Sequence, residues 1–263
     1  MSEPTRSELY DGEVILTMDR RHVYRARIGD AKTVHVPNVT TILNQKDKSR
    51  ALLPWAAGLA ADHIREILKP GISTQLNEIE IDMAVETARN AHNVKRDAAA
   101  SVGSIVHDYA RRRLTGEDVD WPSHPQALNG ADAFESWLGQ HEVQPIKVER
   151  QVLSKKHLYC GTADLLARID NKVTLGDFKT SKDIYDEVFI QTAPYQKAME
   201  EELGVKIEQR AVMHFDKENG DFRYALIPND TLEDDFECFL ALKKVYTWNK
   251  TAWPRVKAAR GEA

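Results

Sequence analysis

The segment Val173-Thr-Leu-Gly-Asp-Phe-Lys179 is largely apolar, yet it carries a carboxylate and an ammonium group. Residues 147–153 and 161–169 have the same short apolar character, and polar turns separate all three segments, so we expect three strands. Because side chains alternate along a strand, Asp177 and Lys179 lie on one face of the third. Charges on an apolar strand are costly unless they are paired or bind a metal. The sequence therefore predicts a site on these strands.

The expected strand register adds two further acids to this site. If the chain turns symmetrically about Asp170-Asn171, Asp164 falls opposite Asp177; if the preceding hairpin turns about Lys156-His157, Glu149 falls opposite Asp164. Neighbouring Cβ atoms in such a row lie about 5 Å apart. Two carboxylates ~4 Å apart repel by about 4 kcal/mol at an effective dielectric constant of about 20. One lysine does not offset three acids, whereas a divalent cation does. A β-bulge would shift this register, and the alternative is a sheet with scattered, solvated acids.

Composition limits the class of protein. The chain has 263 residues, 29% of them charged, and a net charge of −5, which is typical of a folded protein and unlike a wholly basic nucleic-acid binder. No apolar run approaches the roughly 20 residues that span a bilayer, and the polar, acidic N-terminus does not resemble a signal peptide. We therefore expect a cytoplasmic protein that does not bind membranes. Cys160 and Cys238 are expected to be buried free thiols.

The rest of the chain predicts an α/β fold, with a central mixed sheet flanked by helices and a helical N-terminal portion. We expect residues 1–140 to hold an N-terminal β-hairpin and helices and residues 141–263 to form the core, together as one integrated domain. A helix over 191–203 accommodates Pro194 only in its first turn. Thr231 and Asp234 are spaced as a capping box for a final helix to about residue 248. The other expected strands are 14–17, 23–28, 207–215 and 222–227, and the other helical segments are 50–68, 81–100, 100–114 and 126–138.

The order of the polar residues resembles a known family. The motifs are Glu149, Gly161-Thr-Ala-Asp164, Asp177-Phe-Lys179 and Gln191-Thr-Ala-Pro-Tyr195, preceded by Gly103-Ser-Ile-Val-His107. In this order they resemble the PD-(D/E)XK nuclease superfamily, and specifically its RecB-like exonuclease branch, which includes phage exonucleases and the mitochondrial genome maintenance exonuclease. Val36-Pro-Asn-Val-Thr-Thr-Ile-Leu43 and Leu53-Pro-Trp55-Ala resemble an N-terminal signature of that branch. The resemblance implies a restriction-endonuclease-like core.

The resemblance also implies a role for each residue. It assigns His107, Asp164, Asp177 and the carbonyl group of Phe178 as ligands of Mg²⁺ or Mn²⁺, hard cations that prefer oxygen ligands. Lys179 would orient the attacking water or stabilise the developing charge. Glu149 would hold a water outside the direct ligands of the metal, or a second metal, and Gln191 and Tyr195 would position the phosphate or Lys179. The cysteines of the iron–sulfur members of the branch are missing here, so no iron–sulfur cluster is expected.

The function expected from the resemblance is a metal-dependent DNA exonuclease of phage or bacterial recombination and DNA processing. Its partner would be DNA with a free end or a single-stranded portion; the sequence identifies no recombination protein as partner. Arg111, Lys155 and Lys156 are candidate phosphate contacts, and solvated surface charge is an equally good interpretation of each. One alternative function is a catalytically inert nucleic-acid-binding module with the same fold. A zinc hydrolase is a weaker alternative, because the sequence has no His-Glu-x-x-His motif.

Overall fold

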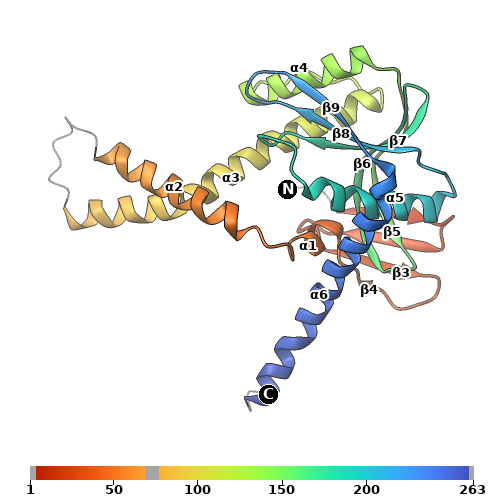
Figure 1. Ribbon diagram of the computed structural model, residues 1–263, viewed down its shortest axis with the longest axis horizontal. Coiled ribbons are helices and arrows are strands. Elements are labelled where there is room, and N and C mark those ends of the chain that lie inside the picture. The colour runs from red at the N-terminus through yellow and green to blue at the C-terminus, as the bar shows by residue number, and fades with distance from the viewer. Residues whose placement is uncertain (1–3, 69–76, 261–263) are drawn as a thin grey trace. The chain divides into compact units, whose positions relative to one another are not determined.

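The centre of the molecule is a mixed five-stranded sheet (Figure 1). The computed structural model describes residues 4–68 and 77–260. In spatial order the strands are β5 (Val143–Ser154), β6 (Tyr159–Ile169), β7 (Lys172–Lys179), β8 (Gln209–Phe215) and β9 (Phe222–Ile227). β7 and β8 pair in parallel, and the other neighbours are antiparallel. The predicted α/β class, with a mixed sheet flanked by helices, is confirmed.

Helices cover both faces of this sheet. On one face, Phe134 of α4 (Pro125–Gln140) contacts Phe178 edge-on, with ring centroids 6.3 Å apart. On the other face, Leu175 packs in a cluster with α5 (Glu187–Leu203) and α6 (Leu232–Ala259). Leu175 and Phe178 are three residues apart on one strand, so they point to opposite faces. The short helix α1 (Val39–Leu43) belongs to the α5 side, and the Asn38 side chain caps it by accepting from the backbone N–H of Thr41.

The strand register agrees with the prediction. Leu165 pairs with Gly176, which puts Asp164 and Asp177 at the next positions of β6 and β7. Val148 pairs with Leu165 and Arg150 with Ala163, so Glu149 faces Asp164 between them. The β6–β7 turn has Asp170 and Asn171 in the left-handed region, as a tight two-residue hairpin requires. The irregularity in β5 lies earlier, between Pro145 and Lys147, where it leaves this register intact.

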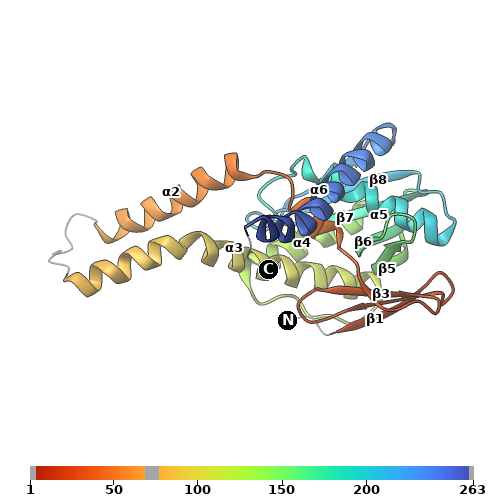
Figure 2. The same ribbon diagram turned by 90° about the horizontal axis from the view of Figure 1, so that it is seen from below.

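The N-terminal segment forms a second sheet (Figure 2), larger than the expected hairpin. Its antiparallel strands are β1 (Thr5–Leu9), β2 (Val14–Met18), β3 (Tyr24–Ile28) and β4 (Val34–His35). Alternate residues of β2 are buried, and they pack with Leu153 and Cys160 of the central sheet. Cys160 is a buried free thiol as predicted, but the prediction was wrong for Cys238, which is exposed on α6.

The chain divides into two compact units, residues 47–105 and the remainder of the chain. The boundary predicted at 140/141 differs from the boundaries of these units; it lies between the end of α4 and the start of β5. Residues 47–105 comprise α2 (Ser49–Ile67) and most of α3 (Glu78–Leu114), with Trp55 edge-on to His92. The two helical segments expected over 81–114 are one continuous helix, because no residue in that stretch breaks it. No helix among the described residues is long and apolar enough to cross a membrane.

Two local expectations were wrong. Pro194 lies well inside α5, whose preceding turns begin at Glu187, so the helix tolerates a missing backbone N–H there. Thr231 makes no capping bond to the backbone of α6. Its hydroxyl instead hydrogen-bonds the carboxylate of Asp235, and the helix continues to Ala259, beyond the expected end.

A buried arginine joins the sheet to the helices above it. Arg210 of β8 is fully buried, and its guanidinium donates to the carbonyl oxygens of Phe189 and Pro228. Its charge is balanced by the Asp235 carboxylate, 2.8 Å away. A buried charge of this kind is tolerated only while its partner remains.

We expect Asp235→Asn to lower the free energy of unfolding by roughly 3–5 kcal/mol, because it leaves the Arg210 charge buried and uncompensated. Urea denaturation followed by circular dichroism measures this. The neighbouring Asp234→Asn is the control, since Asp234 is exposed; equal stability of the two variants would contradict the role given to Asp235.

Candidate functional site

Three side chains from three elements converge on the central sheet, near the middle of β5 and β6. His107 comes from the last turns of α3, Glu149 from β5 and Asp164 from β6, and one ligand atom of each lies within 4.8 Å of the others. The His107 Nδ1 atom is 3.9 Å from Glu149 Oε1 and 3.8 Å from Asp164 Oδ1. All three are partly exposed, so an ion from solvent has access to them.

The position of His107 follows from the helix that carries it. Val106 and Ala110 are fully buried, so this part of α3 is fixed against the protein interior. The His107 ring packs edge-on against Phe178, with ring centroids 5.8 Å apart. A histidine with this spacing on an apolar helix face is most often a core residue, but here its Nδ1 atom faces two carboxylates.

Glu149 has an unusual backbone conformation and a perturbed carboxylate. Its φ of 47° lies in the left-handed region, which costs energy for a residue with a side chain. Burial, together with the negative charge of Asp164, raises the pKa of Glu149 to about 8, and the guanidinium of Arg111 partly opposes this shift. The positive charge of a cation bound at this position would favour the ionised form of Glu149 and offset its repulsion from Asp164.

Asp177 is buried and has polar partners of its own. Its Oδ2 atom lies 2.5 Å from the Lys179 ammonium, and its Oδ1 atom accepts a hydrogen bond of 3.0 Å from the Gln191 amide. The Gln191 oxygen in turn accepts from Lys179 Nζ at 3.1 Å. Asp177, Lys179 and Gln191 thus form a closed triangle between β7 and α5.

The triangle and the His–Glu–Asp group are electrostatically linked. Burial raises the pKa of Asp177, and the Asp164 charge adds to this while Lys179 opposes it. Burial disfavours the charged form of Lys179, but the carboxylates of Asp177 and Asp164 outweigh it and raise its pKa. Asp164 is fixed between the two groups, because its Oδ2 atom accepts a 2.7 Å hydrogen bond from the Phe178 backbone N–H.

The Tyr195 ring packs against β6 at Gly161, which has no side chain to block it. A Cβ atom at Gly161 would fall 2.7 Å from the Tyr195 ring, so β6 needs a glycine at that position. Burial, followed by the charges of Asp164 and Asp177, raises the pKa of Tyr195. Sequence reasoning missed Tyr24 of β3, whose hydroxyl hydrogen-bonds Thr162 and whose pKa is raised by burial and by Glu149. Nothing in the sequence near Tyr24 signals this proximity, because β3 is far from β5 in the chain.

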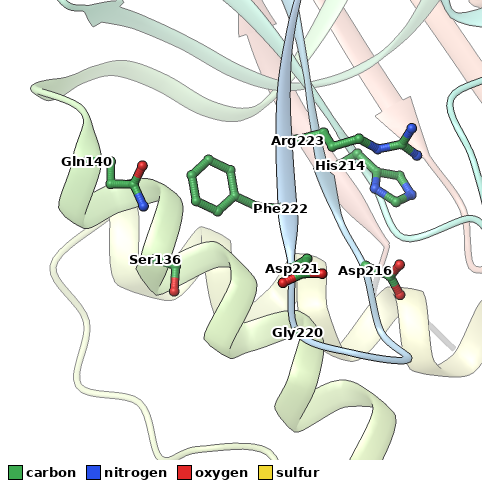
Figure 3. Close-up of a pocket in the computed structure, with 8 residues that line it drawn as sticks. All are labelled: Ser136, Gln140, His214, Asp216, Gly220, Asp221, Phe222 and Arg223. Carbon is green, nitrogen blue, oxygen red and sulfur yellow. The ribbon is translucent and has the colours of Figure 1, made fainter.

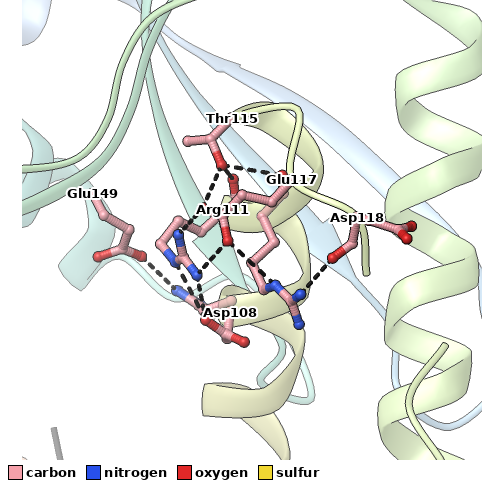
Figure 4. A network of polar contacts seen from close by, with 8 residues as sticks. Asp108, Arg111, Thr115, Glu117, Asp118 and Glu149 are labelled. Atoms are coloured by element: carbon pink, nitrogen blue, oxygen red, sulfur yellow. Dashed lines mark hydrogen bonds and ion pairs between the residues drawn. The ribbon is translucent and has the colours of Figure 1, made fainter. Parts of the chain in front are cut away.

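The structure keeps two of the three candidate phosphate contacts in ion pairs. Arg111 binds Asp108 and Glu117 at 3.0 and 2.6 Å, and Figure 4 shows it between them, with Glu149 nearby. The Lys155 ammonium binds Glu13 at 2.8 Å. Lys156 is exposed, and its backbone N–H donates to Glu201.

A cavity of about 500 Å³ lies elsewhere, between α4 and the β8–β9 hairpin (Figure 3). Ser136 and Gln140 line it from the helix, and His214 and Arg223 from the two strands. None of the residues predicted for the site lines this cavity. The cavity is therefore separate from the candidate site, which consists of the His107–Glu149–Asp164 group and the adjacent Asp177–Lys179–Gln191 triangle.

The residues that converge fit a divalent cation. An imidazole nitrogen and two carboxylates are a donor set used by Mn²⁺ and, with fewer nitrogen ligands, by Mg²⁺. The converging set is His107, Glu149 and Asp164. His107 and Asp164 are two of the four expected ligands, and Glu149 is an additional one. The oxygens of Asp177 are engaged by Lys179 and Gln191, and Phe178 contributes its N–H to Asp164.

No protein-family model matches the sequence, and no curated protein matches it. We therefore infer the function from the residues of the site and their geometry.

We expect the metal-free protein to lose stability as the pH rises through about 8, because the folded state binds the Glu149 proton more tightly than the unfolded state, where the pKa is 4.5. This contribution is complete below the unfolded value and is lost above the folded value. Mn²⁺ should raise the melting temperature more at about pH 8.5 than at about pH 6, since the cation needs the ionised carboxylate. Thermal denaturation at both pH values measures this.

Glu149→Gln should remove this pH dependence, together with the pH-dependent part of the Mn²⁺ effect. Glu237→Gln on the exposed side of α6 is the matched control and should behave like the natural protein. A Mn²⁺ shift of the same size in the Glu149→Gln variant at both pH values would argue against a cation at this carboxylate.

Proposed function

We propose that the protein is a divalent-metal-dependent DNA exonuclease with a restriction-endonuclease-like core, of the RecB-like branch of the PD-(D/E)XK superfamily. It would hydrolyse phosphodiester bonds during recombination or DNA processing. The observation that carries the proposal is a lysine 2.5 Å from a buried aspartate, directly beside a His–Glu–Asp group suited to a cation. The strand order and the parallel β7–β8 pair are compatible with that core.

The chemistry follows from the charges of the residues. His107, Glu149 and Asp164 would hold the cation. Asp177 would add negative charge near it, because its carboxylate interacts electrostatically with that of Asp164. A bound divalent cation supplies Lewis acidity and positive charge next to the scissile phosphate. Lys179, held by Asp177 and Gln191, would keep its ammonium directed at the oxygens on which negative charge develops.

Each supporting residue then has a definite task. Gln191 fixes both the lysine and the aspartate, so it acts as a positioning residue. Tyr195 fills the space over Gly161 and places a buried ring next to β6. The strained backbone of Glu149 is consistent with a site whose geometry is held by the rest of the fold.

The alternative is a nucleic-acid-binding module without turnover. The Asp177–Lys179–Gln191 triangle argues against it, because binding alone does not require a lysine held beside a buried aspartate. The two functions differ in one measurement. An inert module would bind DNA and leave it intact with Mg²⁺ and with Mn²⁺, whereas the nuclease degrades it and stops when EDTA is added.

We expect the purified protein to shorten linear DNA with either cation. Lys179→Met should lower the rate by roughly 100- to 1,000-fold, the usual cost of losing one group that stabilises developing charge. Release of nucleotides from 5′- and 3′-labelled single strands and duplexes measures the rate and the polarity of digestion.

Lys172→Met is the matched control, because Lys172 is an exposed lysine at the other end of β7. Circular dichroism checks that both variants fold. Equal activity of the two variants would contradict the role given to Lys179. Cleavage of a closed circle as fast as of a linear molecule would make the enzyme an endonuclease.

A further inference from the structure

The last helix of the protein carries a concentration of positive charge that the proposed site does not use. From residue 243 to residue 260, α6 contains six lysines and arginines and neither aspartate nor glutamate. The net charge of the whole chain is −5, so the positive charge of this segment is opposite in sign to the net charge of the protein. Figure 1 shows this end of α6 running away from the central sheet.

Basic and aromatic residues alternate along one side of this helix. Spacings of three and four residues place side chains on the same helix face. The residues with this spacing, named here the α6 stripe, are Lys243, Tyr246, Lys250, Trp253, Lys257 and Arg260. Two contacts confirm the arrangement: Lys250 lies over the Tyr246 ring at 5.3 Å, and Arg260 lies over the Trp253 ring at 5.8 Å.

No carboxylate among the described residues balances the charges of the stripe, and two of its cations lie over its own aromatic rings. Within residues 4–68 and 77–260, none of its four cations forms an ion pair, in contrast to Arg111, Arg113 and Lys155, which all do. The Trp253 side chain is also largely in solvent, with 57% of its surface exposed. A row of unpaired cations with an exposed ring among them is suited to an external polyanion that has flat groups to stack.

We propose that the α6 stripe binds single-stranded nucleic acid, with the cations on the phosphates and Trp253 on a base. Binding sites for single strands combine these two features, since every base offers a flat face and the backbone offers regular negative charge. The choice of a nucleic acid rests on the proposed function, which requires the protein to hold a DNA strand. The stripe would add a second contact to the bound DNA strand, away from the catalytic residues.

An anionic membrane surface is the competing partner for a basic helix. A helix that lies in a membrane interface separates a large apolar face from its basic face. In α6 the aromatic rings of the stripe stand among the cations, and the contacts of Lys250 and Arg260 with these rings hold them there. This arrangement favours the nucleic acid.

The experiment measures binding of the full chain to a labelled oligo(dT) of about 30 nucleotides by fluorescence anisotropy, in EDTA so that no hydrolysis occurs. The double variant Lys250→Gln/Lys257→Gln should bind roughly tenfold more weakly and should reduce the slope of log affinity against log salt by about 1.4. The matched control is Lys244→Gln/Arg255→Gln, which removes the same charge from another side of the helix and should change neither quantity by a comparable amount.

A second pair of variants tests stacking. Trp253→Ala should weaken binding by roughly 5- to 150-fold, the range for loss of one stacked base. Trp248→Ala should have little effect, although Trp248 is equally exposed, because it lies off the stripe. Equal losses in the members of either pair would overturn the proposal. So would oligonucleotide binding that is unchanged in the stripe variants while their sedimentation with phosphatidylserine vesicles is lost.

The two proposals fail in different ways. Unchanged binding by the stripe variants, with normal hydrolysis by the natural protein, would remove only the α6 stripe. Absence of hydrolysis with either cation, together with stripe-dependent binding in EDTA, would remove the nuclease and retain the binding surface.

Discussion

The central constraint on this structure is the cost of placing a carboxylate inside an apolar sheet. Asp177 is almost completely buried, and its charge is made tolerable by the Lys179 ammonium and the Gln191 amide. Lys179 lies on the same strand and Gln191 on the helix that follows, so β7 and α5 must meet in one relative position. Asp164 is then fixed by the backbone N–H of Phe178 on that same strand. The rest of the site is assembled around these few bonds.

Much of the central sheet could be predicted from the sequence, because its hairpins are short. A tight turn at Asp170-Asn171 leaves one register for β6 and β7, and the turn before Tyr159 does the same for β5 and β6. From these two turns alone, Glu149, Asp164 and Asp177 were expected at neighbouring positions. For Glu149 and Asp164 this expectation is confirmed by the strand pairs on both sides of them, and for Asp164 and Asp177 by the adjoining pair of Leu165 with Gly176.

Features that depend on distant contacts could not be predicted. The Tyr24 hydroxyl reaches Thr162 only because β3 folds back toward the central sheet. The left-handed backbone of Glu149 has no sequence signal, since glutamate normally avoids that region. Thr231 has the spacing of a helix cap, but its hydroxyl accepts a hydrogen bond from Arg210 and donates one to Asp235 instead of capping the helix. In each case tertiary packing overrides a local preference.

The different environments of the two cysteines have a practical consequence. Cys160 is enclosed, its thiol faces the carbonyl oxygens of Val36 and Pro37, and burial raises its pKa, so it offers almost no thiolate for reaction. Cys238 is open to solvent, near the beginning of the helix that carries the stripe. A maleimide dye would therefore attach to a single position without mutagenesis. The fluorescence of the dye would then report directly on the binding of a ligand to that helix.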